Sequence, residues 1–169
     1  MPRKDRINFI VTGAVIAALY ATLTYLSNAF GLAYGPIQLR LSEILSILPI
    51  FTPAAISGLS VGCFIANIGS FNAADLLFGT LATAGAAYLT YFLRDKRVKG
   101  FPIFAFIPPI IVNALAIGFE ISVFYLKSDN FLWGFLVSFL QVGLSQLIVC
   151  LCFGIPFYMI IKKYRIFKK

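Results

Sequence analysis

Four ionisable side chains stand inside apolar stretches of this sequence: Arg40, Glu43, Asp75 and Glu120. Their neighbours are mostly Leu, Ile, Phe, Ala and Gly. An ionised group in apolar surroundings is costly unless it has a partner or faces a polar cavity, so each of the four is a functional candidate. Because a carboxylate can accept several N–H donors from a ligand, the pattern points to binding chemistry.

Structural roles remain open for three of the four residues. Arg40 and Glu43 are three residues apart, so on one helix face they could neutralise each other. Asp75 follows Asn72 at the spacing of a capping box, and a carboxylate is favourable at a helix N-terminus. Glu120 has no basic residue close by in sequence. It is therefore the strongest candidate for contact with a ligand or a cavity.

Other polar and aromatic residues are expected to complete a substrate-binding site with these four. Asn113 lies seven residues before Glu120, which places both on one stripe of a helix. Interhelical hydrogen bonds are the alternative role for such polar residues, and we favour it for Ser145 and Gln146. The remaining candidates are Gln141, Asn67, Gln38, Tyr34 and Phe71.

Several kinds of catalytic chemistry are not expected. Histidine is absent, which excludes a histidine-based triad or metal site, and the three cysteines lie in apolar runs without a disulfide pattern. No Gly-x-x-x-x-Gly-Lys motif is present, so any ATP chemistry must belong to a partner. We expect neither an enzyme, nor a cofactor, nor a bound metal.

The composition indicates a membrane protein. Of the 169 residues, 60% are hydrophobic and 12% are charged, whereas soluble domains carry roughly a quarter charged residues. The basic residues concentrate in three clusters, at 3–6, 94–99 and 162–169. Clusters separated by long apolar runs are typical of positively charged cytoplasmic loops, whereas a nucleic-acid site would need an accessible basic face.

The positions of the basic clusters predict how many times the chain crosses the membrane. If all three clusters are cytoplasmic, an even number of spans separates each pair, and the apolar lengths fit four spans followed by two. The second span, about 41–51, is too short to cross alone and must be shielded by its neighbours. We therefore predict a single transmembrane domain over 1–169, an all-α bundle of six helices in the cell membrane with both termini cytoplasmic.

This topology also fixes the depth of the polar residues. It places Arg40, Glu43 and Asp75 in the outer half of the bilayer. Glu120 lies there too, roughly 10 Å from the outer end of its helix at 1.5 Å per residue. The first apolar run follows a basic start as a signal peptide would, but five further spans follow, so we expect it to be a retained helix.

Small residues mark a second kind of surface on the first helix. Ala14, Ala17, Ala18 and Ala21 recur at spacings that let another helix approach closely, either inside the bundle or on a partner. In the fifth span, Pro108 and Pro109 free backbone carbonyls and predict a kink.

Three segments of the sequence are distinctive: residues 34–45, which contain Arg40-x-Ser-Glu43, residues 56–67 and residues 75–80. Together they resemble the QueT family of substrate-binding S components of energy-coupling factor (ECF) transporters. The resemblance implies a six-helix S component that binds queuosine precursors, the 7-cyano- or 7-aminomethyl-7-deazaguanines. It also implies partners, namely an EcfT-type transmembrane scaffold and two cytosolic ATPases, with the small-residue face of the first helix docking on the scaffold.

Three other functions remain open from the sequence. The protein could be an S component for another heterocycle, such as a flavin or a pterin. It could be a structural membrane protein with no transport role, although that leaves carboxylates collected at one depth unexplained. An intramembrane enzyme lacks support because no nucleophile stands beside a base.

Overall fold

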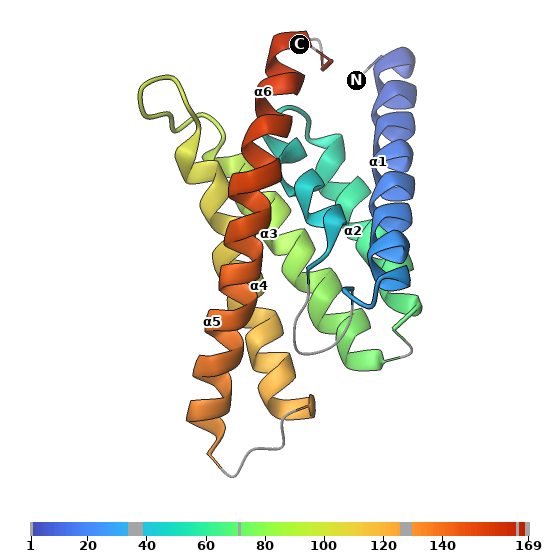
Figure 1. Cartoon of the computed structure of the whole chain (residues 1–169). Coiled ribbons are helices and arrows are strands. Elements are labelled where there is room, and N and C mark those ends of the chain that lie inside the picture. Colours follow the sequence, from blue (N-terminus) through green and yellow to red (C-terminus); the bar gives the residue numbers. More distant parts are fainter. Residues whose placement is uncertain (1, 34–38, 71, 126–129, 165, 168–169) are drawn as a thin grey trace.

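The structure is a computed structural model that describes residues 2–33, 39–70, 72–125, 130–164 and 166–167. Regular secondary structure in these ranges is entirely helical, and it forms six helices, as the sequence predicted (Figure 1). The first three are α1 (Arg3–Ala29), the 3₁₀ helix η1 (Leu41–Ile50) and α2 (Ala54–Ile68).

The last three helices each combine an α-helical part with a tighter or wider turn. The fourth begins with the π turn η2 (Asp75–Gly79) and continues as α3 (Thr80–Leu93). The fifth joins the 3₁₀ turn η3 (Ile103–Phe106), α4 (Ile107–Glu120) and the π turn η4 (Ile121–Tyr125). The sixth joins α5 (Phe131–Val149), the π turn η5 (Cys150–Gly154) and α6 (Ile155–Tyr164).

Four of the six helices are long and apolar enough to cross a membrane, namely those containing α1, α3, α4 and α5. The second helix, η1, is short, as predicted, and it lies within the bundle. Its residues Leu45, Ile47 and Leu48 are buried against neighbouring helices. Pro49 lacks an N–H group and cannot take part in an α-helical hydrogen bond, which is compatible with this short, tight helix.

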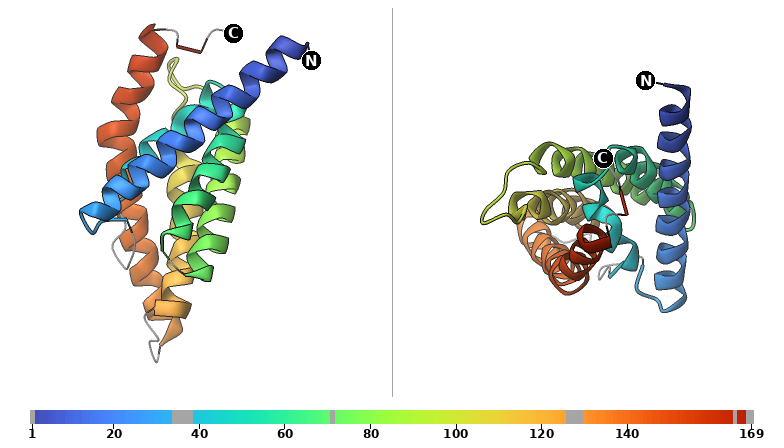
Figure 2. Two further views of the ribbon diagram at one scale, coloured as in Figure 1. Left: turned by 90° about the vertical axis from the view of Figure 1, so that its right-hand side faces the viewer. Right: turned by 90° about the horizontal axis from the view of Figure 1, so that it is seen from above.

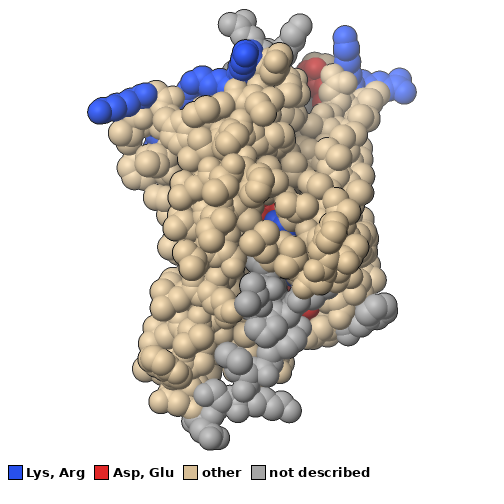
Figure 3. Space-filling model, viewed as in Figure 1, with Lys and Arg blue, Asp and Glu red and all other residues tan. Residues whose placement is uncertain are grey.

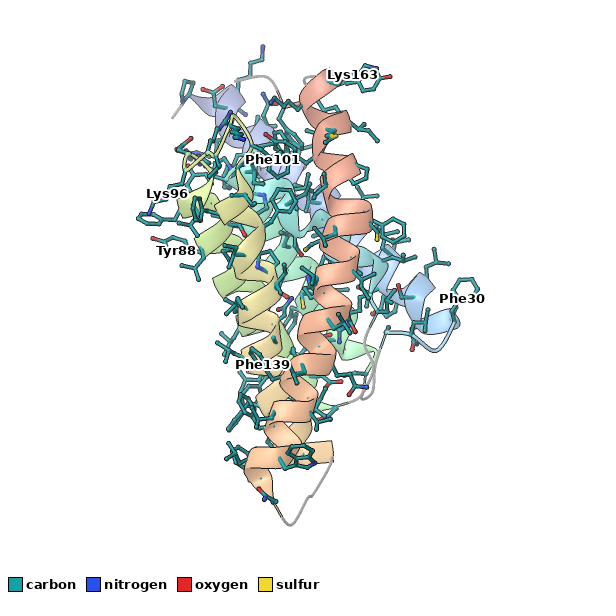
Figure 4. All side chains as sticks on the ribbon, turned by 60° about the vertical axis from the view of Figure 1, so that its left-hand side comes forward. Phe30, Tyr88, Lys96, Phe101, Phe139 and Lys163 are labelled. Atoms are coloured by element: carbon teal, nitrogen blue, oxygen red, sulfur yellow. The ribbon has the colours of Figure 1, made fainter. Side chains whose placement is uncertain are left out.

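One end of the molecule carries the basic clusters, and we call it the basic end. Lys and Arg side chains gather there while the rest of the visible face is almost entirely uncharged (Figure 3). Both termini lie at this end in Figure 1, and Lys96 and Lys163 mark it in Figure 4. The three clusters therefore share one side, as an even number of spans between them requires.

The outer surface between the two ends is apolar. Large side chains such as Tyr88, Leu140 and Leu144 are about 60% exposed or more. Tyr88 projects away from the bundle (Figure 4). In water such a surface would be unfavourable, so its solvent is the hydrocarbon of a bilayer.

Glycines let α1 lie directly on α2 along one side of the bundle (Figure 2). A Cβ atom on Gly58 would lie 2.7 Å from the carbonyl oxygen of Gly13. One on Gly62 would lie 2.7 Å from the carbonyl oxygen of Ala17 and 2.8 Å from Cβ of Tyr20. Gly58 and Gly62 are four residues apart, the spacing at which membrane helices approach backbone to backbone.

The two prolines that were expected to kink the fifth span lie at the start of its α-helical part. Pro108 and Pro109 lie in the first turn of α4, directly after the 3₁₀ turn η3. The first turn of a helix has N–H groups without intrahelical partners, so proline is tolerated there without bending the helix. The two prolines therefore mark where the α-helix begins.

We predict that Gly62→Ala lowers the thermal stability of the detergent-solubilised protein because the added methyl group forces α1 and α2 apart. Overpacking of this kind costs about 1–3 kcal/mol. Gly85→Ala is the matched control, since a Cβ at Gly85 would have no atom within 4 Å. Equal unfolding temperatures for the two variants would show that the close contact between α1 and α2 does not limit stability.

Candidate functional site

The carboxylate of Glu43 lies at the centre of the buried polar residues. Its Oε1 accepts a hydrogen bond from the hydroxyl of Tyr20 on α1 at 2.6 Å. Its Oε2 accepts from the hydroxyl of Ser46 at 2.8 Å and from Nε2 of Gln146 on α5 at 3.0 Å. A longer contact of 3.4 Å joins it to Nδ2 of Asn113 on α4. Four donors compensate the charge for its loss of water.

The local fold explains why Glu43 reaches the centre. Glu43 is in the first turn of η1, whose backbone runs through the interior, and Ser42 and Ser46 beside it are also buried. Ser42 accepts a hydrogen bond of 2.8 Å from the hydroxyl of Thr24, and the N–H of Leu41 donates to Oγ of Ser27 at 2.9 Å. Hydroxyls on α1 thereby hold the polar start of η1 in place.

Arg40 makes a separate set of contacts next to this centre. Its Nε donates to the carbonyl of Ala33 at 2.7 Å, and its Nη1 donates to Oδ1 of Asn67 at 3.1 Å. Asn67 in turn donates through Nδ2 to the backbone carbonyl of Asp75 at 2.9 Å. Arg40 thus links the start of η1, the end of α2 and the start of η2.

Two carboxyl groups meet on the side of the site away from the basic end. Glu120 is 1% exposed and Asp75 is 2% exposed, and the two side chains are close enough to interact directly. Neither carboxyl oxygen of Glu120 has a hydrogen-bond donor among the described residues. Asp75 is the first residue of the π turn η2, and Glu120 is followed at once by the π turn η4. Such wide turns are frequent at functional sites.

A cavity of about 20 Å³ lies beside Glu43. This volume is close to that of a single water molecule and far below the several hundred Å³ of ligand pockets. The described residues therefore leave space for about one water molecule at this point. The residues that line the cavity are Arg40, Glu43, Gly79, Thr83, Asn113, Ile117, Val142 and Gln146.

A cavity of about 830 Å³ lies at the basic end, between the starts of α1 and α2 and the ends of α3 and α6. Its charged lining residues, such as Asp5, Arg94 and Lys162, lie at or next to the ends of the long apolar helices. The buried carboxyl groups are not part of it. We therefore assign the candidate site to the smaller cavity and the adjoining pair of carboxyl groups.

The structure brings together six of the residues that the sequence singled out for substrate binding: Arg40, Glu43, Asn67, Asp75, Asn113 and Glu120. Gln141 is partly exposed and does not line the cavity. Tyr34, Gln38 and Phe71 lie outside the described residues.

The capping prediction is confirmed for Asn72. Its Oδ1 accepts a hydrogen bond of 2.9 Å from the N–H of Ala74, as an N-cap does. Asp75 lies in the first turn of its helix, where a carboxylate is favourable, and its carboxyl group is close enough to act on Glu120.

Sequence reasoning assigned no ligand-site role to Tyr20 or Thr83, and for Gln146 it favoured an interhelical hydrogen bond over a ligand contact. Gln146 does make an interhelical hydrogen bond, but its partner is Glu43 in the centre of the site. The helical spacing could have shown that Gln146 faces the interior. Ser138, Val142 and Gln146 recur every four residues and form the buried stripe of α5. Gln141 lies at the edge of that stripe.

The four alanines of α1 point in two directions. Ala14 and Ala18 are exposed on the outer side of the helix. Ala17 and Ala21 are 6% and 7% exposed and face the interior, where Ala17 contacts the Gly62 region of α2. The expectation that all four form one docking face is therefore corrected: only Ala14 and Ala18 remain accessible to a partner.

Comparison with known proteins identifies the family of this chain. Residues 10–163 match the QueT transporter family. The queuosine precursor transporter QueT of Lactococcus lactis subsp. cremoris (strain MG1363) is 37% identical over 94 residues. That alignment covers 56% of this chain and 56% of the relative, so the chain spans about half the length of the curated relative it matches. No solved structure matches the chain. Since the family match extends over almost all of the described helices, the chain belongs to the QueT transporter family.

Proposed function

We propose that this protein is the substrate-binding S component of an ECF-type importer and that it captures 7-deazaguanine queuosine precursors outside the cell. Bound precursor is then delivered through a transmembrane scaffold subunit driven by two cytosolic ATPases. The observation that carries the proposal is the convergence of Glu43, Asp75 and Glu120 in the interior of an otherwise apolar bundle. Family membership supports transport, and the relative's name supports the substrate.

The orientation of the protein follows from its charges. Cytoplasmic loops of membrane proteins carry an excess of Lys and Arg. We therefore place the basic end, with both termini, in the cytoplasm of a multi-pass plasma-membrane protein. Asp75 and the end of α4 then lie towards the outside, since they are at the end of their helices opposite to the basic end (Figure 1).

The ligand's hydrogen-bonding edge matches the chemistry of this site. The pyrimidine ring of a 7-deazaguanine offers a ring N–H and an adjacent amino group, and one carboxylate can accept from both. Glu120 is suited to this contact because its oxygens have no donor among the described residues. The guanidinium of Arg40 or an amide of Asn113 can donate to the ligand's carbonyl oxygen. A ligand without these groups would leave buried polar atoms unpaired, which is the basis for specificity.

Docking on the scaffold is assigned to the exposed side of α1. Ala14 and Ala18 are four residues apart on that side, and their small side chains would let a partner helix approach closely. The opposite side of α1 is already occupied by α2. One helix would therefore connect the partner subunit to the polar residues around Glu43 through Tyr20.

We predict that Glu120→Gln weakens binding of 7-cyano-7-deazaguanine by roughly tenfold or more, because the carboxylate loses its charge and one acceptor. Isothermal titration calorimetry on the purified protein measures the change. Asp95→Asn is the matched control, since it removes a carboxylate at the basic end. Unchanged affinity in the Glu120 variant would remove Glu120 from the ligand contacts. Tight binding of a flavin or a pterin instead would assign a different S-component specificity.

We predict that replacement of Glu43 lowers the stability of the protein more than its affinity for the precursor. In Glu43→Gln an amide N–H₂ replaces one acceptor oxygen and faces donors, so a buried network is disrupted at a cost of about 1–3 kcal/mol. The unfolding temperature in detergent should fall more than in Glu120→Gln. A Glu43→Gln protein of normal stability that no longer binds precursor would instead make Glu43 a direct ligand contact.

We predict that the double variant Ala14→Trp, Ala18→Trp abolishes uptake into cells or proteoliposomes that contain the complete transporter while purified protein still binds precursor. Leu140→Trp with Leu144→Trp is the control, because these residues are also exposed and four residues apart, on α5. Equal loss of binding and uptake in the alanine variant would mean that this face of α1 packs inside the protein.

A further inference from the structure

The cavity at the basic end is large enough to hold a ligand of its own. Its volume is about 830 Å³, within the range of about 300–1,000 Å³ that is usual for ligand pockets. Several of its lining side chains, among them Arg97 and Lys162, are exposed, so the cavity is accessible from the surface. It shares no lining residue with the small cavity beside Glu43.

The charges that line this cavity leave a positive surplus. Oδ2 of Asp95 lies 3.5 Å from Nε of Arg94, and this is the only ion pair among the residues that the structure describes. Asp5 is in the first turn of α1, where the helix dipole favours a carboxylate. The two remaining cations, Arg97 and Lys162, therefore face the cavity without a carboxylate at salt-bridge distance in the described part of the chain.

Another part of the cavity wall is apolar. It is formed by Phe9 of α1, by Phe51 and Pro53 between η1 and α2, and by Ile161 of α6. The ring of Phe51 packs on that of Tyr158, with 5.2 Å between their centroids. A small soluble anion would leave this wall exposed to water, whereas an amphipathic anion would cover it.

The cavity lies where the lipid headgroups of a bilayer would be. Its tyrosines, Tyr91 and Tyr158, come from the ends of apolar helices, and tyrosine is enriched at the membrane–water interface. The guanidinium of Arg94 lies 3.6 Å from the centre of the Tyr91 ring. Towards the basic end α1 leans away from α6 (Figure 2), and residues of both helices line the cavity.

We infer that this cavity binds an anionic phospholipid of the cytoplasmic leaflet. Arg97 and Lys162 bind its phosphate, and the apolar wall around Phe51 contacts the upper part of its acyl chains. Cytoplasmic leaflets contain anionic lipids, and basic pockets between membrane helices bind their headgroups. The inference goes beyond the proposed function and takes from it only that the basic end faces the cytoplasm.

Native mass spectrometry of the full-length protein in detergent, titrated with phosphatidylglycerol, tests the inference. Wild-type protein is expected to bind one molecule more tightly than phosphatidylcholine with the same acyl chains, because the choline group cancels the negative charge. The double variant Arg97→Gln, Lys162→Gln should bind phosphatidylglycerol roughly tenfold more weakly or worse, since each basic residue near an anionic lipid contributes about fivefold.

Lys96→Gln with Lys163→Gln is the matched control. It also removes one charge from each of the same two basic clusters, but neither residue lines the cavity. Lys96 projects away from the bundle (Figure 4). This variant should keep the wild-type affinity for phosphatidylglycerol.

Three results would overturn the inference. Equal weakening in both double variants would mean that the lipid responds only to the overall charge of the basic end. Equal binding of the two lipids to wild-type protein would mean that the cavity does not select a negative charge. Displacement of phosphatidylglycerol by an equal concentration of glycerol 3-phosphate would assign the cavity to soluble phosphate compounds. Binding of the 7-deazaguanine precursor should be unchanged in all variants, so each of these results would leave the proposed function intact.

Discussion

A carboxylate among apolar helices is stable only where the protein supplies hydrogen-bond donors, and this condition determines how the bundle is assembled around Glu43. Donors come from α1, η1, α4 and α5, so four separate segments must meet at one point. Interhelical hydrogen bonds and close packing drive association in a bilayer, because lipid chains are as apolar as the helices. The same contacts that position the site therefore also hold the helices together.

The two sides of α1 have different surroundings: one side faces the buried polar site and the other side is exposed. On the inner side, Ala17 and Tyr20 face α2 and Glu43, and the close approach depends on Gly62. On the outer side, Ala14 and Ala18 are exposed. Displacement of α1 would therefore change the surroundings of Glu43 directly.

The helix count and the short second helix could be predicted because long apolar runs and basic clusters are properties of sequence alone. The hydrogen-bond partners of Arg40 and Glu43 could not be predicted from the sequence. Helical spacing suggested that they pair, but Arg40 has an extended backbone, with φ −89° and ψ 121°, and precedes η1. Its side chain therefore contacts Ala33 and Asn67 instead. Which side of α1 is buried depended likewise on the position of α2, which no local pattern encodes.

The π turn at Asp75–Gly79 lets the chain hold one extra residue at the start of α3. A π turn contains one residue more than an α turn of the same helix, and its wider backbone absorbs that residue locally. Deletion of a single residue within it would therefore restore regular α geometry while the helix on either side keeps its orientation. Among relatives of this protein, a one-residue gap at this turn is therefore compatible with the same arrangement of the flanking helices.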